Sequence, residues 1–135
     1  MYHNILVPIS FDPDRDTTAP VKLAGILATE NARITLLHVI EDVPSYAISY
    51  LPAEYVAESQ KAVTEEIEAL AANVPGATGV VVHGHSARSI LDYAEEHGAD
   101  LIVIASHRPG MQDLLLGSTA SQVVRHAKSA VHIIR

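Results

Sequence analysis

The sequence predicts an α/β protein whose parallel sheet is covered by helices on both faces. Five short apolar runs rich in Val, Ile and Leu occur along the 135 residues, and runs of this kind are typical of strands buried on both sides. Amphipathic segments with helical spacing separate them, which gives the order β-α-β-α-β-α-β-α-β. No repeat or linker interrupts this order, so we expect one domain over residues 1–135.

The first strand is predicted at residues 5–9 and ends near Pro8, because proline cannot donate to a strand ladder. A polar loop follows. The next segment predicts a helix that is capped at Thr17 or Thr18 and carries Pro20 in its first turn. Apolar residues then recur on one face, and this helix is expected to end around residues 30–31.

The middle of the chain predicts two further strands and two helices. Residues 34–40 form the second strand, and residues 41–52 are expected to be irregular because they contain two prolines. Apolar spacings of seven, four, three and four residues predict a helix over 53–74. The third strand covers 79–83, and a helix capped by Ser86 runs to residues 97–98.

The last third of the chain predicts a strand, a helix and a final strand. The fourth strand covers residues 101–105, and the helix runs from Ser118 to Lys128. Thr119 and Gln122 have the spacing of a capping box at the start of this helix. Residues 130–134 close the chain as the fifth strand.

Composition excludes several classes of function. The formal net charge of −7 argues against binding to nucleic acid or to an anionic membrane, because both favour a basic protein surface. The absence of cysteine rules out disulfides, thiolate catalysis and cysteine-based zinc sites. No apolar run is long enough to span a bilayer, and the chain start does not resemble a signal peptide. We therefore expect a soluble cytoplasmic protein.

The strongest candidate site is the loop between the strand ending at Ala105 and the helix beginning at Ser118. Parallel sheets bind ligands beyond the carboxyl ends of their strands, where the winding direction reverses. A helix start offers unpaired N–H groups and a partial positive charge. Gly117 allows close backbone approach, and Ser118 or Thr119 can cap the helix or donate to an oxygen. These residues predict a phosphate site, with an ordinary capped loop as the alternative.

Several segments, taken together and in order, resemble the universal stress protein family. The resemblance covers essentially the whole chain. The segments that carry it are Met1–Pro8, Leu36–Val39, Gly84, Ala99–Ile104, Leu115–Ser118, Val124–Ala127 and Val131–Arg135. It implies a Rossmann-like, adenine nucleotide α-hydrolase-like fold with the strand order 3-2-1-4-5, in which the first and fourth strands flank the switch point.

The resemblance also implies a ligand, because many family members bind ATP through a Gly-x2-Gly-x9-Gly-Ser/Thr loop. This chain departs from that loop, since Ala105 and Arg108 stand at the first two glycines and the loop is one residue shorter. Gly117-Ser118 is retained, and the Ser-His-Arg-Pro…Gly-Ser form resembles a nucleotide-binding bacterial subgroup. Ser10 replaces an aspartate that ATP-binding relatives usually carry. ATP is therefore the expected ligand, with AMP or ADP as variants and Mg²⁺ accompanying the nucleotide.

Carried over position by position, the resemblance implies four sets of nucleotide contacts. The floor would be formed by Pro8, Ile9 and Ser10, the adenine contacts by Val39, and the wall beside base and ribose by Ile104 and Ala105. The phosphates would lie along Ser106, His107, Arg108 and Gly110, with donors from Gly117, Ser118 and Thr119. The Arg108 guanidinium is suited to phosphate oxygens, and a solvated loop arginine is the alternative.

Other patterns predict assembly rather than chemistry. The last strand is expected at an open sheet edge, and relatives commonly dimerise there. We therefore expect a homodimer through Ala130, Val131, His132, Ile133 and Ile134. His83 and His85 have the spacing of a metal pair, but no cysteine completes it, so no metal site is predicted.

Three function hypotheses follow from the sequence. The first is an ATP- or AMP-binding stress-response module, and the second is a dimeric scaffold of the same fold that has lost nucleotide binding. The third is an enzyme of the wider adenine nucleotide α-hydrolase-like superfamily, which would need substrate-binding elements that 135 residues leave little room for. No nucleophile–base–orienter set is recognisable, so catalytic turnover is not expected.

Overall fold

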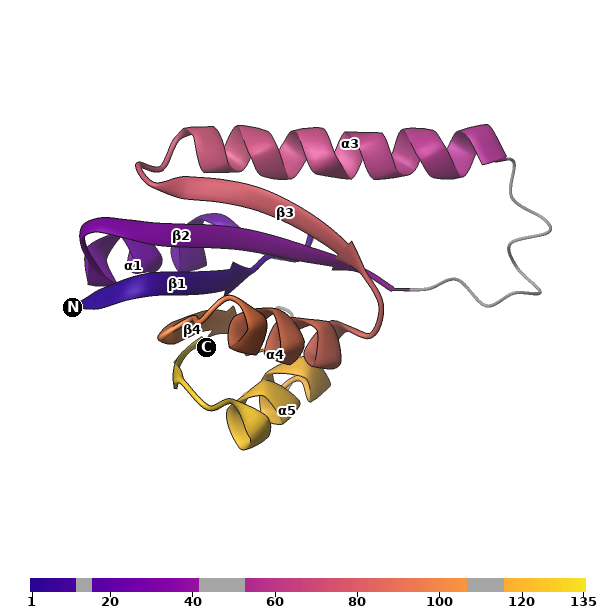
Figure 1. The fold of residues 1–135 in the computed structure, drawn as a ribbon. Coiled ribbons are helices and arrows are strands. Elements are labelled where there is room, and N and C mark those ends of the chain that lie inside the picture. Colours follow the sequence, from indigo (N-terminus) through magenta and orange to yellow (C-terminus); the bar gives the residue numbers. More distant parts are fainter. Residues whose placement is uncertain (12–15, 42–52, 107–115) are drawn as a thin grey trace.

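The computed structural model describes residues 1–11, 16–41, 53–106 and 116–135. These ranges form a five-stranded sheet in the order β3-β2-β1-β4-β5, with every neighbouring pair parallel (Figure 1). The predicted fold class and strand order are confirmed. The strands are β1 (Tyr2–Pro8), β2 (Ala28–Ile40), β3 (Ala77–His83), β4 (Leu101–Ala105) and β5 (Ala130–Ile134).

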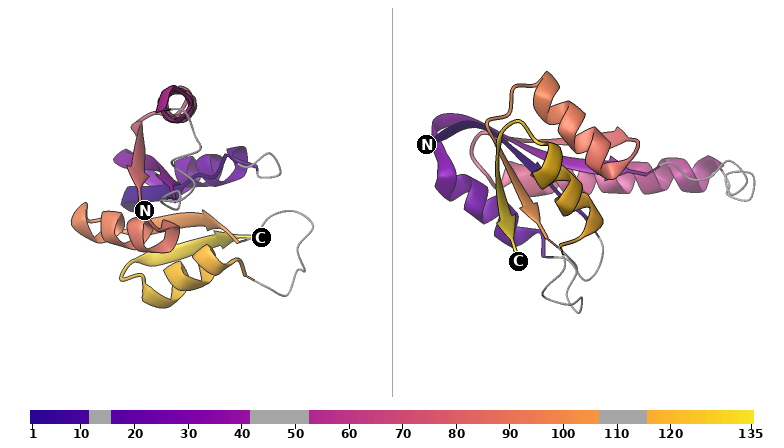
Figure 2. Two further views of the ribbon diagram at one scale, coloured as in Figure 1. Left: turned by 90° about the vertical axis from the view of Figure 1, so that its right-hand side faces the viewer. Right: turned by 90° about the horizontal axis from the view of Figure 1, so that it is seen from below.

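Helices cover both faces of this sheet, as Figures 1 and 2 show. Side chains alternate along each strand, so Ile5 and Val7 of β1 point to one face and Leu6 points to the other. The first face is packed by α1 and α3, and the second by α4 and α5. The helices are α1 (Thr18–Leu27), α3 (Ala53–Ala72), α4 (Ser86–Glu96) and α5 (Ser118–His126).

Helix α3 rests on the sheet through its carboxyl-terminal half. Its buried residues are Ile67 and Ala71, and its amino-terminal part extends past the ends of the strands (Figure 1). A Cβ atom at Gly79 of β3 would lie 3.0 Å from the backbone carbon and oxygen of Ile67. The glycine therefore allows the helix to approach the strand closely.

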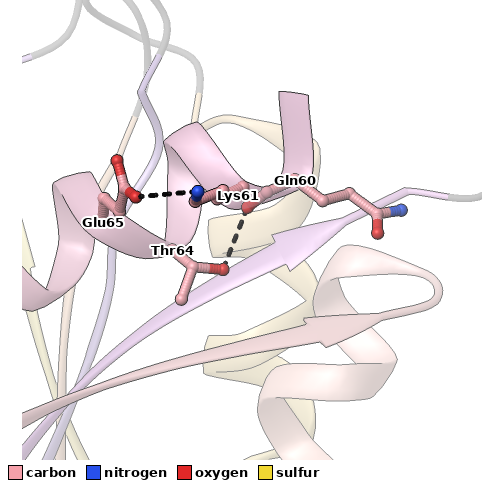
Figure 3. Close-up of polar contacts among 4 residues, drawn as sticks. All are labelled: Gln60, Lys61, Thr64 and Glu65. Atoms are coloured by element: carbon pink, nitrogen blue, oxygen red, sulfur yellow. Dashed lines mark hydrogen bonds and ion pairs between the residues drawn. The ribbon is translucent and has the colours of Figure 1, made fainter. Parts of the chain in front are cut away.

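Two polar interactions lie along α3, one exposed and one part-buried. Lys61 and Glu65, one helical turn apart, form an ion pair of 4.0 Å, and Thr64 Oγ1 donates to the carbonyl of Gln60 at 2.9 Å (Figure 3). Such exposed ion pairs contribute little to stability. The apolar face of this helix, rather than its polar face, therefore fixes it on the sheet.

The junction between α1 and β2 differs from the prediction. β2 begins at Ala28, directly after α1, whereas the sequence predicts helix to residues 30–31. Tyr2 at the start of β1 pairs with Ala28, and the register shifts before Asn4. Asn31 lies in this irregular stretch with a φ of 64°, a conformation that asparagine tolerates better than most residues. Pairing with the start of the chain thus ends the helix early.

The other boundaries lie within a few residues of the predicted ones, as is usual for frayed ends. The predicted cap of α4 is wrong. Ser86 is the first residue of α4, and His85 is its N-cap, with Nδ1 accepting from the Arg88 N–H at 3.4 Å. Most of the predicted irregular segment, residues 42–52, lies outside the described residues. In the described ranges, none of the helices has the length and apolar character needed to cross a bilayer.

Candidate functional site

A cleft of about 470 Å³ lies at the carboxyl ends of β1, β2 and β4. Because β1 sits between β2 and β4, the chain winds away from it in both directions, and the cleft occupies this switch point. The first turns of three helices complete its walls. The lining residues are Pro8, Ile9, Ser10, Asp16, Thr17, Pro20, Leu37, His38, Val39, Glu41, Ser86, Ile90, Ile104, Ala105, Ser106, Gly117, Ser118, Thr119 and Ala120.

Residues predicted from the sequence gather in this cleft from four separate parts of the chain. The ones that line it are Pro8, Ile9, Ser10, Val39, Ile104, Ala105, Ser106, Gly117, Ser118 and Thr119. His107, Arg108 and Gly110 lie outside the described residues. The cleft is also lined by Glu41 and Ser86, which the sequence did not predict, and by His38, which was expected near the pocket without a contact to the ligand. Their positions at or just after the ends of β2 and β3 are the signal that could have identified them.

Ser106 joins the end of β4 to the start of α5. Its N–H donates to the carbonyl of Ile134 at 2.8 Å, and its own carbonyl accepts from the Gly117 N–H at 2.5 Å. The residue is 2% exposed, yet its hydroxyl has no hydrogen-bond partner in the described part of the chain. A buried hydroxyl without a partner costs free energy, so this atom has an unmet hydrogen-bonding capacity next to the cleft.

The start of α5 has the same character. Its N-cap is Gly117, with no side-chain cap, and the intrahelical bonds begin with the Ser121 N–H donating to the Gly117 carbonyl at 2.9 Å. The predicted capping box of Thr119 and Gln122 is therefore wrong. The first N–H groups of the helix, which lines the cleft from Ser118 onward, keep their capacity for an anion.

The backbone conformation at position 117 does not require a glycine. Its φ of −60° and ψ of 155° are available to any residue. A glycine here therefore gives space beside the helix start rather than an unusual dihedral angle.

At the other end of the cleft, the backbone edge of β2 extends past the end of β1. Residues of a parallel strand turn their N–H and C=O groups alternately to the two neighbouring strands. Ile34 and Ile40 bond toward β3, through Gly76 and Gly84, whereas the Leu37 carbonyl accepts from the Ile9 N–H at 2.8 Å. By this alternation Val39 faces β1, but the strand pairing ends at Pro8. The N–H and C=O of Val39 therefore point into the cleft.

The side chain of His38 supplies the carbonyl of Ile9 with the hydrogen bond that a continued ladder would otherwise give it. Its Nδ1 lies 2.8 Å from the carbonyl oxygen of Ile9. A carbonyl oxygen can only accept, so Nδ1 carries the proton. The ring of Phe11 packs against the imidazole, with ring centroids 5.2 Å apart and an interplanar angle of 49°. These two contacts hold the half-buried imidazole in one orientation.

Two carboxylates and the starts of three helices line the cleft. Glu41, at the end of β2, accepts from the Ser86 hydroxyl at 2.8 Å, and Asp16 accepts from the Thr18 N–H at 2.8 Å. No lysine or arginine of the described ranges lines the cleft. Positive potential there comes from helix starts, that of α5 among them, and Glu41 places a carboxylate at the β2 end. An elongated ligand would accordingly place an anion at α5 and hydrogen-bond donors near Glu41.

Side chains that could ligate a metal are scattered rather than clustered in the described ranges. They contain no group of three His, Asp or Glu side chains that could hold a metal ion. His83 and His85 are both exposed, and His85 is used as the cap of α4. On the surface, Lys128 donates a hydrogen bond to Glu95 at 2.7 Å. This bond and the negative charge of Glu95 raise the pKa of Lys128.

Comparison with known proteins places this fold and cleft in a family. The model of the universal stress protein family matches residues 1–135. Universal stress protein A homolog 2 of Coxiella burnetii is 34% identical over 99% of this chain and 95% of its own length. Universal stress protein G of Escherichia coli O157:H7 is 30% identical over the full length of both chains.

Solved structures agree with the sequence relatives. Universal stress protein UspA from Lactobacillus plantarum has a TM-score of 0.74 and 28% identity, covering 99% of this chain and 98% of its own. A universal stress protein in complex with cAMP has a TM-score of 0.63 and 24% identity, covering 99% and 97%. The universal stress protein from Archaeoglobus fulgidus in complex with dAMP has a TM-score of 0.59 and 18% identity, covering 99% of this chain and 98% of its own. At 24% and 18% identity, these two structures show a likeness of fold alone.

Proposed function

The chain belongs to the universal stress protein family, and from this premise we propose that its cleft binds an adenine nucleotide, ATP or AMP. In this proposal the protein is a stress-response module that acts through ligand binding rather than through turnover. The observation that carries it is the buried hydroxyl of Ser106, which has no hydrogen-bond partner among the described residues, beside the start of α5, which has no side-chain cap. Two other proteins of this fold are in complex with cAMP and dAMP.

The α5 end of the cleft takes the phosphates. Its N–H groups and helix dipole favour an anion, and the Ser106 hydroxyl adds a donor that no described residue uses. The space at Gly117 lets an oxygen approach the backbone closely. We place His107, Arg108 and Gly110 in the same phosphate set, and Mg²⁺ enters with ATP to offset the charge of the triphosphate.

The β2 end takes the base. An N–H and a C=O on one residue, as at Val39, are complementary to the acceptor and amino donor on the Watson–Crick edge of adenine. Ile104 and Ala105 would lie between the two ends, beside base and ribose, over the floor formed by Pro8, Ile9 and Ser10. Since β2 and β4 are separated by β1, the two ends are about 10 Å apart, a span that a nucleoside fills.

A homodimer through β5 completes the proposal. β5 is an edge strand of the described sheet. Because the Ile134 carbonyl bonds to Ser106, alternation turns the backbone of Ala130, His132 and Ile134 toward β4 and that of Val131 and Ile133 outward. An outward row of N–H and C=O groups can pair with a second copy. A dimeric scaffold that binds no nucleotide is the competing function.

Identification of bound nucleotide, followed by titration, separates these functions. Protein purified without added nucleotide is denatured, and the released small molecules are identified by mass spectrometry. Calorimetric titration with ATP and AMP, with and without Mg²⁺, is then expected to show one site per chain. If millimolar ATP with Mg²⁺ gives no binding, the nucleotide proposal fails and the scaffold stands.

A pair of glycine variants locates the site. Gly117→Val places a branched side chain at the α5 start, and it is expected to weaken ATP binding at least tenfold, the equivalent of about 1.4 kcal/mol. Gly25→Ala in α1 is the control, because a Cβ atom there meets nothing within 4 Å. Equal ATP affinity in the Gly117→Val variant and the wild type would show that the phosphates bind elsewhere.

A further inference from the structure

We propose that His38 is a positioning residue that keeps the backbone edge of Val39 open for the base of the ligand. The inference rests on the proposed nucleotide function for its consequence, but its structural part holds for the ligand-free protein. It concerns a competition between two donors for one acceptor, the carbonyl oxygen of Ile9.

The first donor is the one that a regular ladder would use. In a parallel pair, a residue that donates to position j−1 of its neighbour accepts from position j+1. Ile9 donates to the carbonyl of Leu37, so its own carbonyl would accept from the N–H of Val39. That bond would add one rung to the β1–β2 ladder and would remove the Val39 N–H from the cleft.

The second donor is the imidazole of His38, and it is the one observed. Its Nδ1–H satisfies the Ile9 carbonyl at 2.8 Å, so the carbonyl does not need the Val39 N–H. The ring cannot turn away easily, because Phe11 packs against it. The side chain therefore supplies the bond that ends the ladder, and the Val39 N–H faces the cleft as a donor for a ligand.

The spacing of the two residues explains why this role belongs to position 38. His38 precedes Val39, and adjacent side chains of a strand point to opposite faces of the sheet. Val39 packs with the α4–α5 core, so His38 lies on the α1 side, where the segment from Ile9 to Phe11 runs. A donor at this position reaches the carbonyl oxygen of Ile9 without entering the space where the base would lie.

Amide hydrogen exchange in the ligand-free protein tests this directly. The Val39 amide is expected to exchange fast in the wild type, while Thr35 and Leu37, which lie inside the β1–β2 pairing, exchange slowly. In His38→Leu the Ile9 carbonyl takes the Val39 N–H, so exchange at Val39 slows by about tenfold or more. His38→Asn is the matched control, because its amide nitrogen takes the place of Nδ1 and should keep Val39 exchanging fast.

Either of two outcomes overturns the proposal: a Val39 amide as protected as Leu37 in the wild type, or no gain of protection when the donor is removed. Should His38→Leu fail to fold, His38→Gln replaces it, since its amide extends to the Nε2 position instead. The wild-type measurement alone can refute the idea, whatever the variants do.

Titration then connects the edge to the ligand. His38→Leu is expected to bind AMP about tenfold more weakly, the effect of one lost hydrogen bond, and His38→Asn to stay close to the wild type. Inorganic tripolyphosphate, which lacks a base, should bind all three proteins equally. Wild-type protein that binds neither AMP nor ATP refutes the nucleotide function but leaves the exchange result standing. Equal AMP affinity in all three proteins, with slowed Val39 exchange in His38→Leu, refutes the base contact alone.

Discussion

Removing the buried hydroxyl in Ser106→Ala is expected to stabilise the ligand-free protein and, at the same time, to weaken nucleotide binding. The residue is 2% exposed and its Oγ has no partner among the described residues. A buried hydroxyl in this state costs about 1–3 kcal/mol. Alanine removes that oxygen and keeps the Cβ atom in place, so the gain exceeds the few dispersion contacts that are lost.

The size of the effect can be stated as a melting temperature. A net gain of about 1 kcal/mol in a chain of 135 residues corresponds to a rise of roughly 3–4 °C, because the unfolding entropy is about 2.1 cal/mol/K per residue. In the opposite direction, one hydrogen bond to the ligand is worth about 0.5–1.5 kcal/mol. ATP affinity should therefore fall by about two- to tenfold.

The assay is differential scanning calorimetry in a phosphate-free buffer, with and without ATP, together with calorimetric titration. Ser129→Ala is the control, because Ser129 lies outside the cleft and its hydroxyl donates to the Ala130 carbonyl at 3.2 Å. It should change neither quantity appreciably. An unchanged melting temperature with unchanged affinity in Ser106→Ala would refute the reasoning, because the hydroxyl would then be neither unsatisfied nor a ligand group.

Three further changes test the frame around the cleft. Gly79→Ala should destabilise the protein by about 1–3 kcal/mol in urea unfolding, because its Cβ atom would crowd the α3 backbone, and a neutral result would contradict that packing. Asp100→Asn should lower stability by about 1–2 kcal/mol in the same assay, since its carboxylate accepts from two N–H groups at the start of β1, at 2.8 and 3.0 Å. Val131→Pro removes an outward N–H and should give a folded monomer in light scattering. His132→Pro is the contrast, because it removes an N–H that faces β4 and should unfold the chain. A Val131→Pro variant that remains a dimer would refute the β5 interface.

The fold could be predicted from the sequence because each element carries its own local signal. β4 is a continuous apolar run that begins at Leu101, and its predicted bounds agree with the structure. The end of α1 could not be predicted in this way. Residues 28–31 are compatible with a helix locally, and only the pairing of Ala28 with Tyr2, distant in sequence, makes them a strand.

The candidate site shows the same division. The residues that line the cleft could be located because they directly follow apolar strands or begin a helix, as Ser10 and Ser118 do. The role of His38 could not be inferred, since it depends on which of two donors meets the Ile9 carbonyl. The lack of a side-chain cap on α5 could not be predicted either. Thr119 and Gln122 have the spacing of a capping box, but α5 starts at Ser118 and its N-cap is Gly117.

The backbone bond between Ser106 and Gly117 has a consequence for how this site can change. It ties the end of β4 to the start of α5 regardless of the residues between them. Doubling the length of a closed loop costs only about 0.6 kcal/mol of closure entropy. The strand end and the helix start can therefore keep their mutual geometry at small cost when the sequence between them changes in length. Ligand preference is thereby free to diverge faster than the fold that presents the ligand.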